Sequence, residues 1–423
     1  MTIGLTAPPE SARPEPAGRG RRMPRWATAM ITVGIAMFAL ALTATLTGQN
    51  ELTSSGTTQA AVGLMLPILL AGLGGLWSER AGVINIGLEG MMILGTWGAA
   101  FAGYNWGPWV GLVGGIVFGA LGGALHAVAT VTFNVNHIIS GVAITLLGAG
   151  VTQYLSALIF EPISRNPRSS PRVEGFDSYS VQPLADWFGA LEEQRIPILS
   201  DFGGLLRGVL TGLSPLVILS LLLVPLSYYV LWRTSFGLRL RSTGENPYAA
   251  ESLGIGVYAY KYAAVIISGG LAGMGGAALV LFPGQLGYLE GQTGGRGYIG
   301  LAAMIFGNWR PAGTLAGAAL FGFVDGLQLR AGGEAVHALL YGGSLLAVAV
   351  AVWWLARRRW VAAAAALGAG LLVYLLYITT DTVPRELAAY APQLVTLLVL
   401  AIAAQRLRPP AADGLGYRRG EGG

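Results

Sequence analysis

A series of long apolar segments, separated by short polar ones, constrains the fold of this chain more than any other feature. Most of them have about 20 residues, enough for a helix to cross the roughly 30 Å hydrocarbon core of a bilayer. We expect crossings at residues 26–46, 60–77, 83–104, 108–130, 137–160, 213–232, 262–282, 298–309, 312–329, 337–356, 360–377 and 387–404. The sequence therefore predicts an all-α polytopic membrane protein of about 10–12 transmembrane helices, whose backbone groups are satisfied within each helix.

The composition agrees with this class and excludes several others. Of the 423 residues 53% are apolar and 11% are charged, which is unlike a soluble domain. The net charge of +5 does not indicate nucleic-acid binding, because basic residues of membrane proteins collect in cytoplasmic loops. The absence of cysteine excludes disulfides, thiolate metal sites and cysteine nucleophiles, and it leaves the compartment open.

Charge predicts the orientation of the chain in the membrane. The basic residues of several loops fall on the same side of the expected helices as the N-terminal tail, as the positive-inside tendency requires. These residues are Arg80, Arg233, Arg239, Arg241, Lys261, Arg310, Arg357, Arg358, Arg359, Arg406 and Arg408. We therefore predict that both termini are cytoplasmic.

Polar stretches divide the chain into regions. The first apolar segment is longer than the apolar part of a signal peptide, so we expect it to be retained as a helix. The predicted regions are a disordered basic tail at 1–24, a transmembrane domain at 25–405 and a cytoplasmic tail at 406–423; the transmembrane domain includes an external loop at 161–212, a cytoplasmic loop at 233–260 and an extra helical hairpin at 337–378. The external loop is either a plain connector or part of a surface that receives another protein.

Glycine marks the predicted helix contacts. Glycine recurs every fourth residue at 111, 115, 119 and 123, and again at 269 and 273 and at 313 and 317, which predicts smooth helix faces that approach each other closely. The short segment 298–309 follows the glycine-rich run 291–297, and we interpret it as a broken helix. A weak similarity between residues 86–97 and 299–309 is either chance or the trace of two structural repeats, which in many transporters flank the substrate route.

The polar loop between residues 232 and 261 contains the signals of one short helix. Asn246 is a good N-cap, Pro247 suits the first helical position, and Gly254 can end the helix in the left-handed conformation. Two turns of helix are marginal in water, so the helix needs a packing partner. It is either an ordinary capped helix of a surface loop or a docking element for another protein.

Two stretches of the sequence resemble a known family. Residues 244–255, Gly-Glu-Asn-Pro-Tyr-Ala-Ala-Glu-Ser-Leu-Gly-Ile, resemble the coupling loop of ABC importer permeases of the branched-chain amino acid, ribose and nucleoside type. Residues 78–92, Ser-Glu-Arg-Ala-Gly-Val-Ile-Asn-Ile-Gly-Leu-Glu-Gly-Met-Met, are more similar to the nucleoside and simple-sugar branch. The resemblance covers roughly residues 60–330 and resumes at 391–394 and 416–419.

The resemblance implies a bacterial inner-membrane permease subunit, type II importer-like, with two pseudo-symmetric repeats. It implies a cytoplasmic ABC ATPase that binds ATP and Mg²⁺, a second permease subunit in a heterodimer, and an external substrate-binding lipoprotein, all within membrane lipid. No cofactor is expected in this chain, and no nucleic acid. The residues that would contact the ATPase are Gly244, Glu245, Asn246, Pro247, Ala249, Ala250, Glu251 and Gly254. The implied cargo is a nucleoside, with a simple sugar such as ribose or a branched-chain amino acid as the alternatives.

The sequence itself contains no site for an energy source or for covalent catalysis. A phosphate-binding loop needs a lysine after its glycines, and the one lysine, Lys261, follows Tyr260. No His-x-x-x-His pair or Gly-x-Ser-x-Gly motif is present, so we do not expect an enzyme. An ion-coupled secondary carrier remains the runner-up, although the chain has no series of membrane carboxylates and histidines to carry protons.

Six residues are candidates for the substrate pathway. We expect a weakly polar lining, because a high-affinity external protein would do the selecting and a tight membrane site would slow release. The candidates are Asn85, Glu89, Trp97, Asn136, Ser140 and Asn308. Each has a structural alternative, which for Glu89 is a hydrogen-bonded contact between helices. Residues 136–145 also resemble the family, but His137 and Thr145 depart from its pattern, which leaves the substrate open.

Overall fold

The computed structural model describes residues 25–194, 196–384, 387, 390 and 407–420. Within these ranges the chain forms helices and no strand. The helices are α1 Arg25–Thr47, η2 Asn50–Leu52, α2 Ser55–Arg80, α3 Leu88–Trp106, α4 Pro108–Ala127, η3 Val128–Thr132, α5 His137–Leu155, η4 Ser156–Phe160, α6 Glu161–Ser164, α7 Gln182–Glu193, α8 Leu199–Leu210, α9 Pro215–Arg233, α10 Ser235–Glu245, α11 Pro247–Ser252, α12 Val257–Leu281, α13 Arg296–Phe306, α14 Pro311–Ala356 and α15 Trp360–Thr379.

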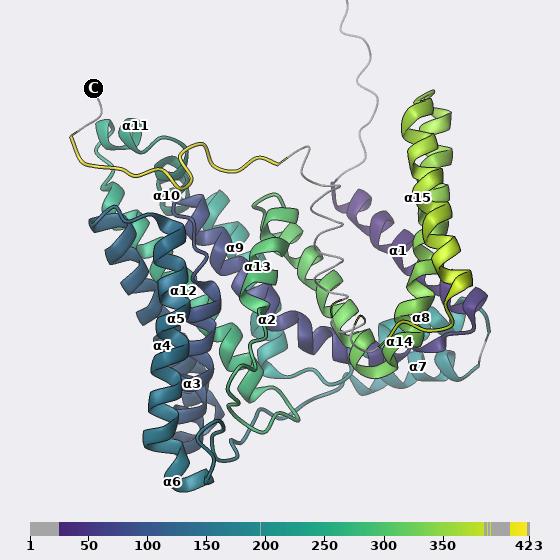
Figure 1. Cartoon of the computed structure of the whole chain (residues 1–423), viewed down its shortest axis with the longest axis horizontal. Coiled ribbons are helices and arrows are strands. Elements are labelled where there is room, and N and C mark those ends of the chain that lie inside the picture. The colour runs from purple at the N-terminus through teal and green to yellow at the C-terminus, as the bar shows by residue number, and fades with distance from the viewer. Residues whose placement is uncertain (1–24, 195, 385–386, 388–389, 391–406, 421–423) are drawn as a thin grey trace, which may run out of the picture.

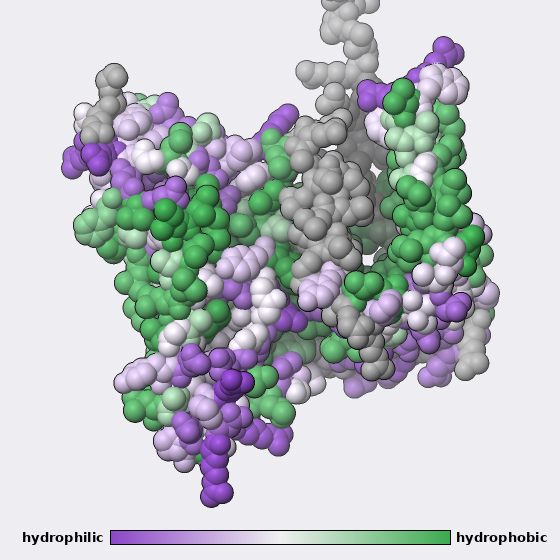
Figure 2. Space-filling view, viewed as in Figure 1, coloured by the Kyte–Doolittle hydropathy of each residue, from purple (hydrophilic) through white to green (hydrophobic). Residues whose placement is uncertain are grey.

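The prediction of an all-α polytopic membrane protein is confirmed. Seven helices of the described part are long and apolar enough to cross a membrane: Ser55–Arg80, Pro108–Thr132, His137–Ser164, Pro215–Arg233, Val257–Leu281, Pro311–Ala356 and Trp360–Thr379. Figure 2 shows the corresponding hydrophobic band between two hydrophilic ends of the molecule. The expected crossing at 387–404 lies, apart from residues 387 and 390, outside the described residues.

The expected crossings 83–104, 312–329 and 337–356 differ in the structure, whereas the short segment 298–309 is as expected. Helix α3 starts five residues later than expected and is mostly covered by other helices, so it need not be as apolar as a lipid-facing one. Helix α13 has 11 residues, in agreement with a broken segment. The expected crossings 312–329 and 337–356 are joined in α14, which reverses its direction at Gly332 (φ 60°, ψ −146°) and continues beside α15 (Figure 1).

The centre of the molecule is a bundle in which α12 lies against α2, α3 and α4. The glycine faces predicted on α4 and α12 interlock there: a Cβ atom on Gly119 would lie 2.3 Å from the Gly269 carbonyl oxygen, and one on Gly123 would lie 2.6 Å from that of Val265. Backbone therefore packs directly on backbone. Such a contact excludes lipid and leaves no space for a side chain.

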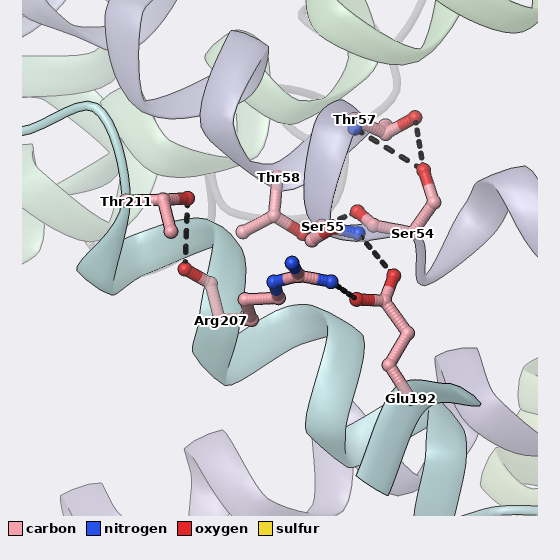
Figure 3. A network of polar contacts seen from close by, with 7 residues as sticks. All are labelled: Ser54, Ser55, Thr57, Thr58, Glu192, Arg207 and Thr211. Atoms are coloured by element: carbon pink, nitrogen blue, oxygen red, sulfur yellow. Dashed lines mark hydrogen bonds and ion pairs between the residues drawn. The ribbon is translucent and has the colours of Figure 1, made fainter. Parts of the chain in front are cut away.

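Residues 161–212, which we expected to be an external loop, contain a helical hairpin that the sequence analysis missed. Its helices α7 and α8 pack against each other, and α8 also contacts α2 (Figure 1). Glu192 accepts hydrogen bonds from the Ser55 amide (3.0 Å) and from the Arg207 guanidinium (3.1 Å), as Figure 3 shows. The carboxylate thus lies at the positive end of α2, where the helix dipole favours it, and ties the hairpin to the membrane bundle.

We expect Gly119→Ala to destabilise the protein, because the new methyl group would collide with the backbone of α12 at Gly269 and Gly273. Overpacking of this kind costs about 1–3 kcal/mol. The matched control is Gly150→Ala on α5, where no atom lies within 4 Å of the added Cβ. Thermal unfolding of the purified protein should show a clear loss for Gly119→Ala and none for Gly150→Ala. Equal unfolding temperatures would contradict the tight α4–α12 contact.

Candidate functional site

The turn between α2 and α3, residues 81–87, is a non-helical segment that is largely buried in a membrane protein. Irregular backbone at membrane depth requires hydrogen-bond partners from the surrounding protein. The Ser78 hydroxyl donates to the Val83 carbonyl (2.6 Å), and the Ile84 amide donates to Nδ1 of His137 (3.2 Å). Nε2 of His126 lies 3.1 Å from the Ile84 carbonyl and donates to it. Helices α4 and α5 therefore satisfy the turn through two histidines.

The candidate Ser140 belongs to the same network. Its hydroxyl lies 2.8 Å from Nδ1 of the buried His126 side chain. With Nε2 of a neutral His126 donating to Ile84, Nδ1 is the acceptor and the Ser140 hydroxyl is the donor. The Ile84 carbonyl, which can only accept, thus fixes the tautomer of His126, and the Ser140 hydroxyl completes the hydrogen bonding of its ring.

Asn85 is the fully buried side chain at the middle of the turn. Its amide nitrogen donates to the Ser268 hydroxyl of α12 at 2.9 Å. Its amide oxygen has no hydrogen-bond partner in the described part of the chain. A buried polar atom without a partner is unusual in a folded protein and marks a candidate contact for a ligand or a water molecule.

Glu89, in the first turn of α3, holds the beginning of the short helix α13. Its two carboxylate oxygens accept hydrogen bonds from the amides of Gly295 (2.9 Å) and Gly297 (2.7 Å). A carboxylate is favoured at this place because the first amides of a helix have no partner within it. The neighbouring Arg296 pairs with Asp325 of α14 at 2.9 Å. The geometry thus matches the expectation of an interhelical contact for Glu89.

The other three pathway candidates lie apart from this turn. Trp97 is buried further along α3 and its ring contacts those of Phe101, Phe118 and Phe160. Asn136 is the exposed N-cap of α5, and it accepts hydrogen bonds from the Ile138 and Ile139 amides. Asn308 accepts a hydrogen bond from the Arg408 amide in the C-terminal tail (2.9 Å). The structure therefore brings together Asn85, Glu89 and Ser140, but not Trp97, Asn136 or Asn308.

The two similar sequence segments meet on helix α2. A Cβ atom on Gly75 would lie 3.2 Å from the side chain of Leu88 and 3.5 Å from that of Leu301, which are equivalent positions of the two segments. Both leucines also belong to one small apolar cluster with Met91. The two segments therefore converge on the same face of α2.

The polar loop after α9 forms the predicted capped helix. Asn246 caps α11 by accepting a hydrogen bond from the Ala249 amide (3.0 Å), Pro247 occupies the first turn, and Gly254 has φ +79°. The side chain of Leu253 is 80% exposed. Helix α11 therefore has one face packed on the protein and another, at the end of the molecule, free of contacts within the described chain (Figure 1).

The C-terminal tail, residues 407–420, joins this loop to the buried turn. The Ala412 amide donates to the Gly244 carbonyl (2.9 Å) and the Gly414 amide donates to the Gly82 carbonyl (3.4 Å). Gly82 and Gly244 also touch, since a Cβ atom on Gly244 would lie 2.9 Å from the Gly82 nitrogen. The Ala411 amide donates to the Glu245 carboxylate at 3.2 Å.

The end of the tail packs on α11 itself. The Tyr417 ring is buried, with its centroid 5.2 Å from that of Tyr248 and 5.5 Å from that of Tyr258. Arg419 forms an ion pair with Glu251 of α11 at 3.6 Å. Sequence reasoning singled out residues 416–419 as similar to the family, but it gave them no role, because their partners lie far away in the chain.

Asp413 gives the tail a titratable contact. Burial raises the pKa of the Asp413 carboxyl to about 7, although a hydrogen bond with Glu79 and the charges of Lys261 and Arg80 favour its ionised form.

In the described part of the chain no group of three His, Asp or Glu side chains could hold a metal ion.

Comparison with known proteins gives consistent matches. The family model described as branched-chain amino acid transport system / permease component matches residues 57–349. The guanosine ABC transporter permease protein NupQ of Bacillus subtilis is 35% identical over 62% of this chain and 78% of its own length. The nucleoside ABC transporter permease protein NupC of Lactococcus lactis is 31% identical over 83% of this chain and 93% of its own length.

A third relative is named for a different cargo. The putative glucose ABC transporter permease protein TsgC13 of Haloferax volcanii is 38% identical over 66% of this chain and 78% of its own length. No solved structure matches the chain.

We expect docking of the tail to weaken as the pH rises. The pKa of Asp413 is about 7 in the docked tail and would return toward its ordinary 3.8 in a released, solvated one. The docked state therefore binds more protons between these values, so its stability is greatest at low pH, falls across this range and levels off above about pH 7.

The chain contains no cysteine, so Ala411→Cys provides a single labelling site for a fluorophore. Anisotropy of the label should fall as the pH is raised from about 5 to about 7, the range set by the shifted carboxyl. In an added Asp413→Asn background the amide does not titrate, and the change should disappear. An anisotropy that rises with pH, or an equal change in both proteins, would contradict the expectation.

Proposed function

This chain belongs to the family of permease components of branched-chain amino acid transport systems and is a membrane-spanning subunit of an ABC importer, and we propose that its cargo is a nucleoside. The observation that carries this cargo is the similarity to two relatives named for guanosine and nucleosides, one of which aligns over 93% of its length. The relative named for glucose supports a simple sugar as the second candidate.

We propose that the energy comes from a separate ATPase that binds the exposed face of α11. Ala249 of α11 and Leu253, the residue directly after this helix, are exposed, while Pro247 and Ala250 are buried against the protein. A short helix with a fixed start, a fixed end and an exposed apolar side chain suits a groove on a partner. The one lysine, Lys261, is buried in α12 near the Tyr417 ring, a position unsuited to holding nucleotide phosphates.

The proposed coupling residues form two groups. Asn246, Pro247, Ala249 and Gly254 shape α11 and its exposed face, whereas Gly244, Glu245, Ala250 and Glu251 bind it to the tail and the bundle. Closing of the ATPase would move α11, and the contact between Gly244 and Gly82 would carry the motion to the buried turn.

The turn is the proposed place where this motion reaches the substrate pathway. Glu89 connects it to the start of α13, so a displacement of α3 would also displace that short helix. The unpartnered amide oxygen of Asn85 suits a hydrogen-bond donor of a passing polar solute. Trp97, Asn136 and Ser140 remain candidates as supports of this route, and Asn308 as a contact of the tail.

We propose the orientation of the protein in the membrane from the position of α11. With this helix at the cytoplasmic surface, the hairpin α7–α8 lies at the external end of the molecule (Figure 1). We propose that an external binding protein docks at that end, that a second, different permease subunit completes the pathway, and that both termini are cytoplasmic.

The assembly purified in nanodiscs tests the function directly. Its ATPase activity is measured with the cognate binding protein loaded with guanosine, ribose, glucose or leucine in turn. Stimulation by the nucleoside alone is the expected result, whereas stimulation by glucose alone would assign the second candidate. Uptake of labelled nucleoside by proteoliposomes of this permease without any ATPase would instead indicate a secondary carrier.

We expect Leu253→Asp to prevent the ATPase from binding while leaving the protein inserted. An aspartate at the centre of an apolar contact removes at least about 2 kcal/mol, or roughly thirtyfold in affinity. The matched control is Leu238→Asp on α10, which replaces another exposed leucine of the same polar loop. Co-purification of the ATPase and stimulated hydrolysis should be lost only in Leu253→Asp. A variant with normal hydrolysis would remove α11 from the coupling path.

A further inference from the structure

The turn that joins α14 to α15 consists of three consecutive arginines, Arg357, Arg358 and Arg359, all of them exposed. The Arg357 guanidinium lies 4.2 Å from the ring centroid of Trp353, and that of Arg359 lies 4.9 Å from that of Trp354. Figure 1 shows this turn at the same edge of the molecule as α11. The family match ends at residue 349, so the turn lies beyond the part of the chain that defines the permease.

The backbone of the turn is unusual for an arginine. Arg358 has φ 57°, in the left-handed region. The amide of Arg358 donates to the Leu355 carbonyl (2.9 Å), and that of Arg359 donates to the Trp354 carbonyl (3.0 Å). This is the pattern in which a helix normally ends at a glycine. An arginine is less stable there, so its presence calls for a role of the side chain.

The three guanidinium groups have no acidic partner among the described residues, where the ion pairs lie elsewhere in the chain. The turn therefore concentrates three positive charges at one place. Trp360 is 67% exposed and Trp353 is 48% exposed. Exposed tryptophans beside arginines at a helix end are typical of the boundary between lipid tails and headgroups.

We propose that the Arg357–Arg359 turn binds the phosphate of an anionic phospholipid, with Trp353 and Trp360 against the upper part of its acyl chains. Guanidinium groups pair with phosphate oxygens through two parallel hydrogen bonds, which gives the contact direction as well as strength. The neighbouring α15 begins without a side-chain cap, so its first amides face the same region. Assignment of the site to the cytoplasmic leaflet rests on the proposed function, but binding itself does not.

A lipid bound at this turn would affect how the α14–α15 hairpin sits in the bilayer. Helix α15 and the second half of α14 stand beside the main bundle (Figure 1), and their surface is largely hydrophobic (Figure 2). Contacts between such a surface and lipid tails are not directional, and hydrophobic matching sets its depth only within a modest free-energy cost per ångström. A headgroup bound at the turn fixes the depth of the hairpin in the bilayer.

Native mass spectrometry of the full chain in detergent, titrated with phosphatidylglycerol or phosphatidylcholine, tests the proposal. An arginine near an anionic surface contributes about fivefold in affinity. We therefore expect the first phosphatidylglycerol to bind more than about tenfold tighter than phosphatidylcholine. The triple variant Arg357→Gln/Arg358→Gln/Arg359→Gln should lose this preference.

The matched control is Arg165→Gln/Arg168→Gln/Arg172→Gln, which removes three charges from the other end of the molecule and should keep the preference. Retention of the preference by the turn variant, or its absence in the natural protein, would overturn the proposal. Inorganic phosphate in large excess should not displace the lipid, because it lacks acyl chains; displacement would indicate a site for free phosphate and would also overturn the assignment.

Arg358→Gly keeps the experiment decisive if the triple variant does not fold. Glycine suits φ 57°, so the unfolding temperature without lipid should equal or exceed that of the natural protein. Affinity for phosphatidylglycerol should nevertheless fall about fivefold, because one guanidinium is lost. A stable Arg358→Gly protein with unchanged affinity would exclude a lipid role for this residue. None of these measurements depends on the ATPase or the cargo, so they remain valid if the transport proposal fails.

Discussion

The structure depends on hydrogen-bond partners for the backbone groups of one buried, irregular turn, residues 81–87. Between α2 and α3 the chain leaves the helical conformation inside a membrane protein, where unpaired amides and carbonyls are costly. Its partners come from His126 on α4, His137 on α5, Ser268 on α12 and the amide of Gly414 in the tail. Because every one of these partners belongs to a different element, the turn fixes the relative positions of those elements.

Local signals allowed parts of this arrangement to be predicted from the sequence. The cap of α11 could be predicted because Asn246 and Pro247 act on amides within the next few residues. The glycine faces of α4 and α12 could be predicted because their period is that of a helix. The partners of Glu89 could not, since the amides of Gly295 and Gly297 lie 206 and 208 residues away and carry no side-chain signal.

For other residues, the type of side chain alone did not predict which part of the structure would surround it. Trp97 was a pathway candidate as an aromatic residue, yet its ring packs within an aromatic cluster with Phe101, Phe118 and Phe160. Asn136 has the signal of a helix cap, and that is its place in the structure. The hairpin α7–α8 was missed because its prolines and glycines suggested a connector. Its apolar residues, such as Trp187 and Leu191, recur at helical spacing and were the signal to follow.

The tail changes how motion at α11 can be transmitted. A two-turn helix joined to the bundle only by its own loop would tilt freely, and a force on its exposed face would be lost in the loop. Here Tyr417 and Arg419 bind one side of α11, while Ala412 and Gly414 bind the backbone of Gly244 and Gly82. Loop, tail and buried turn thus form one connected body. A displacement of α11 must therefore either move the turn with it or break the contacts of the tail.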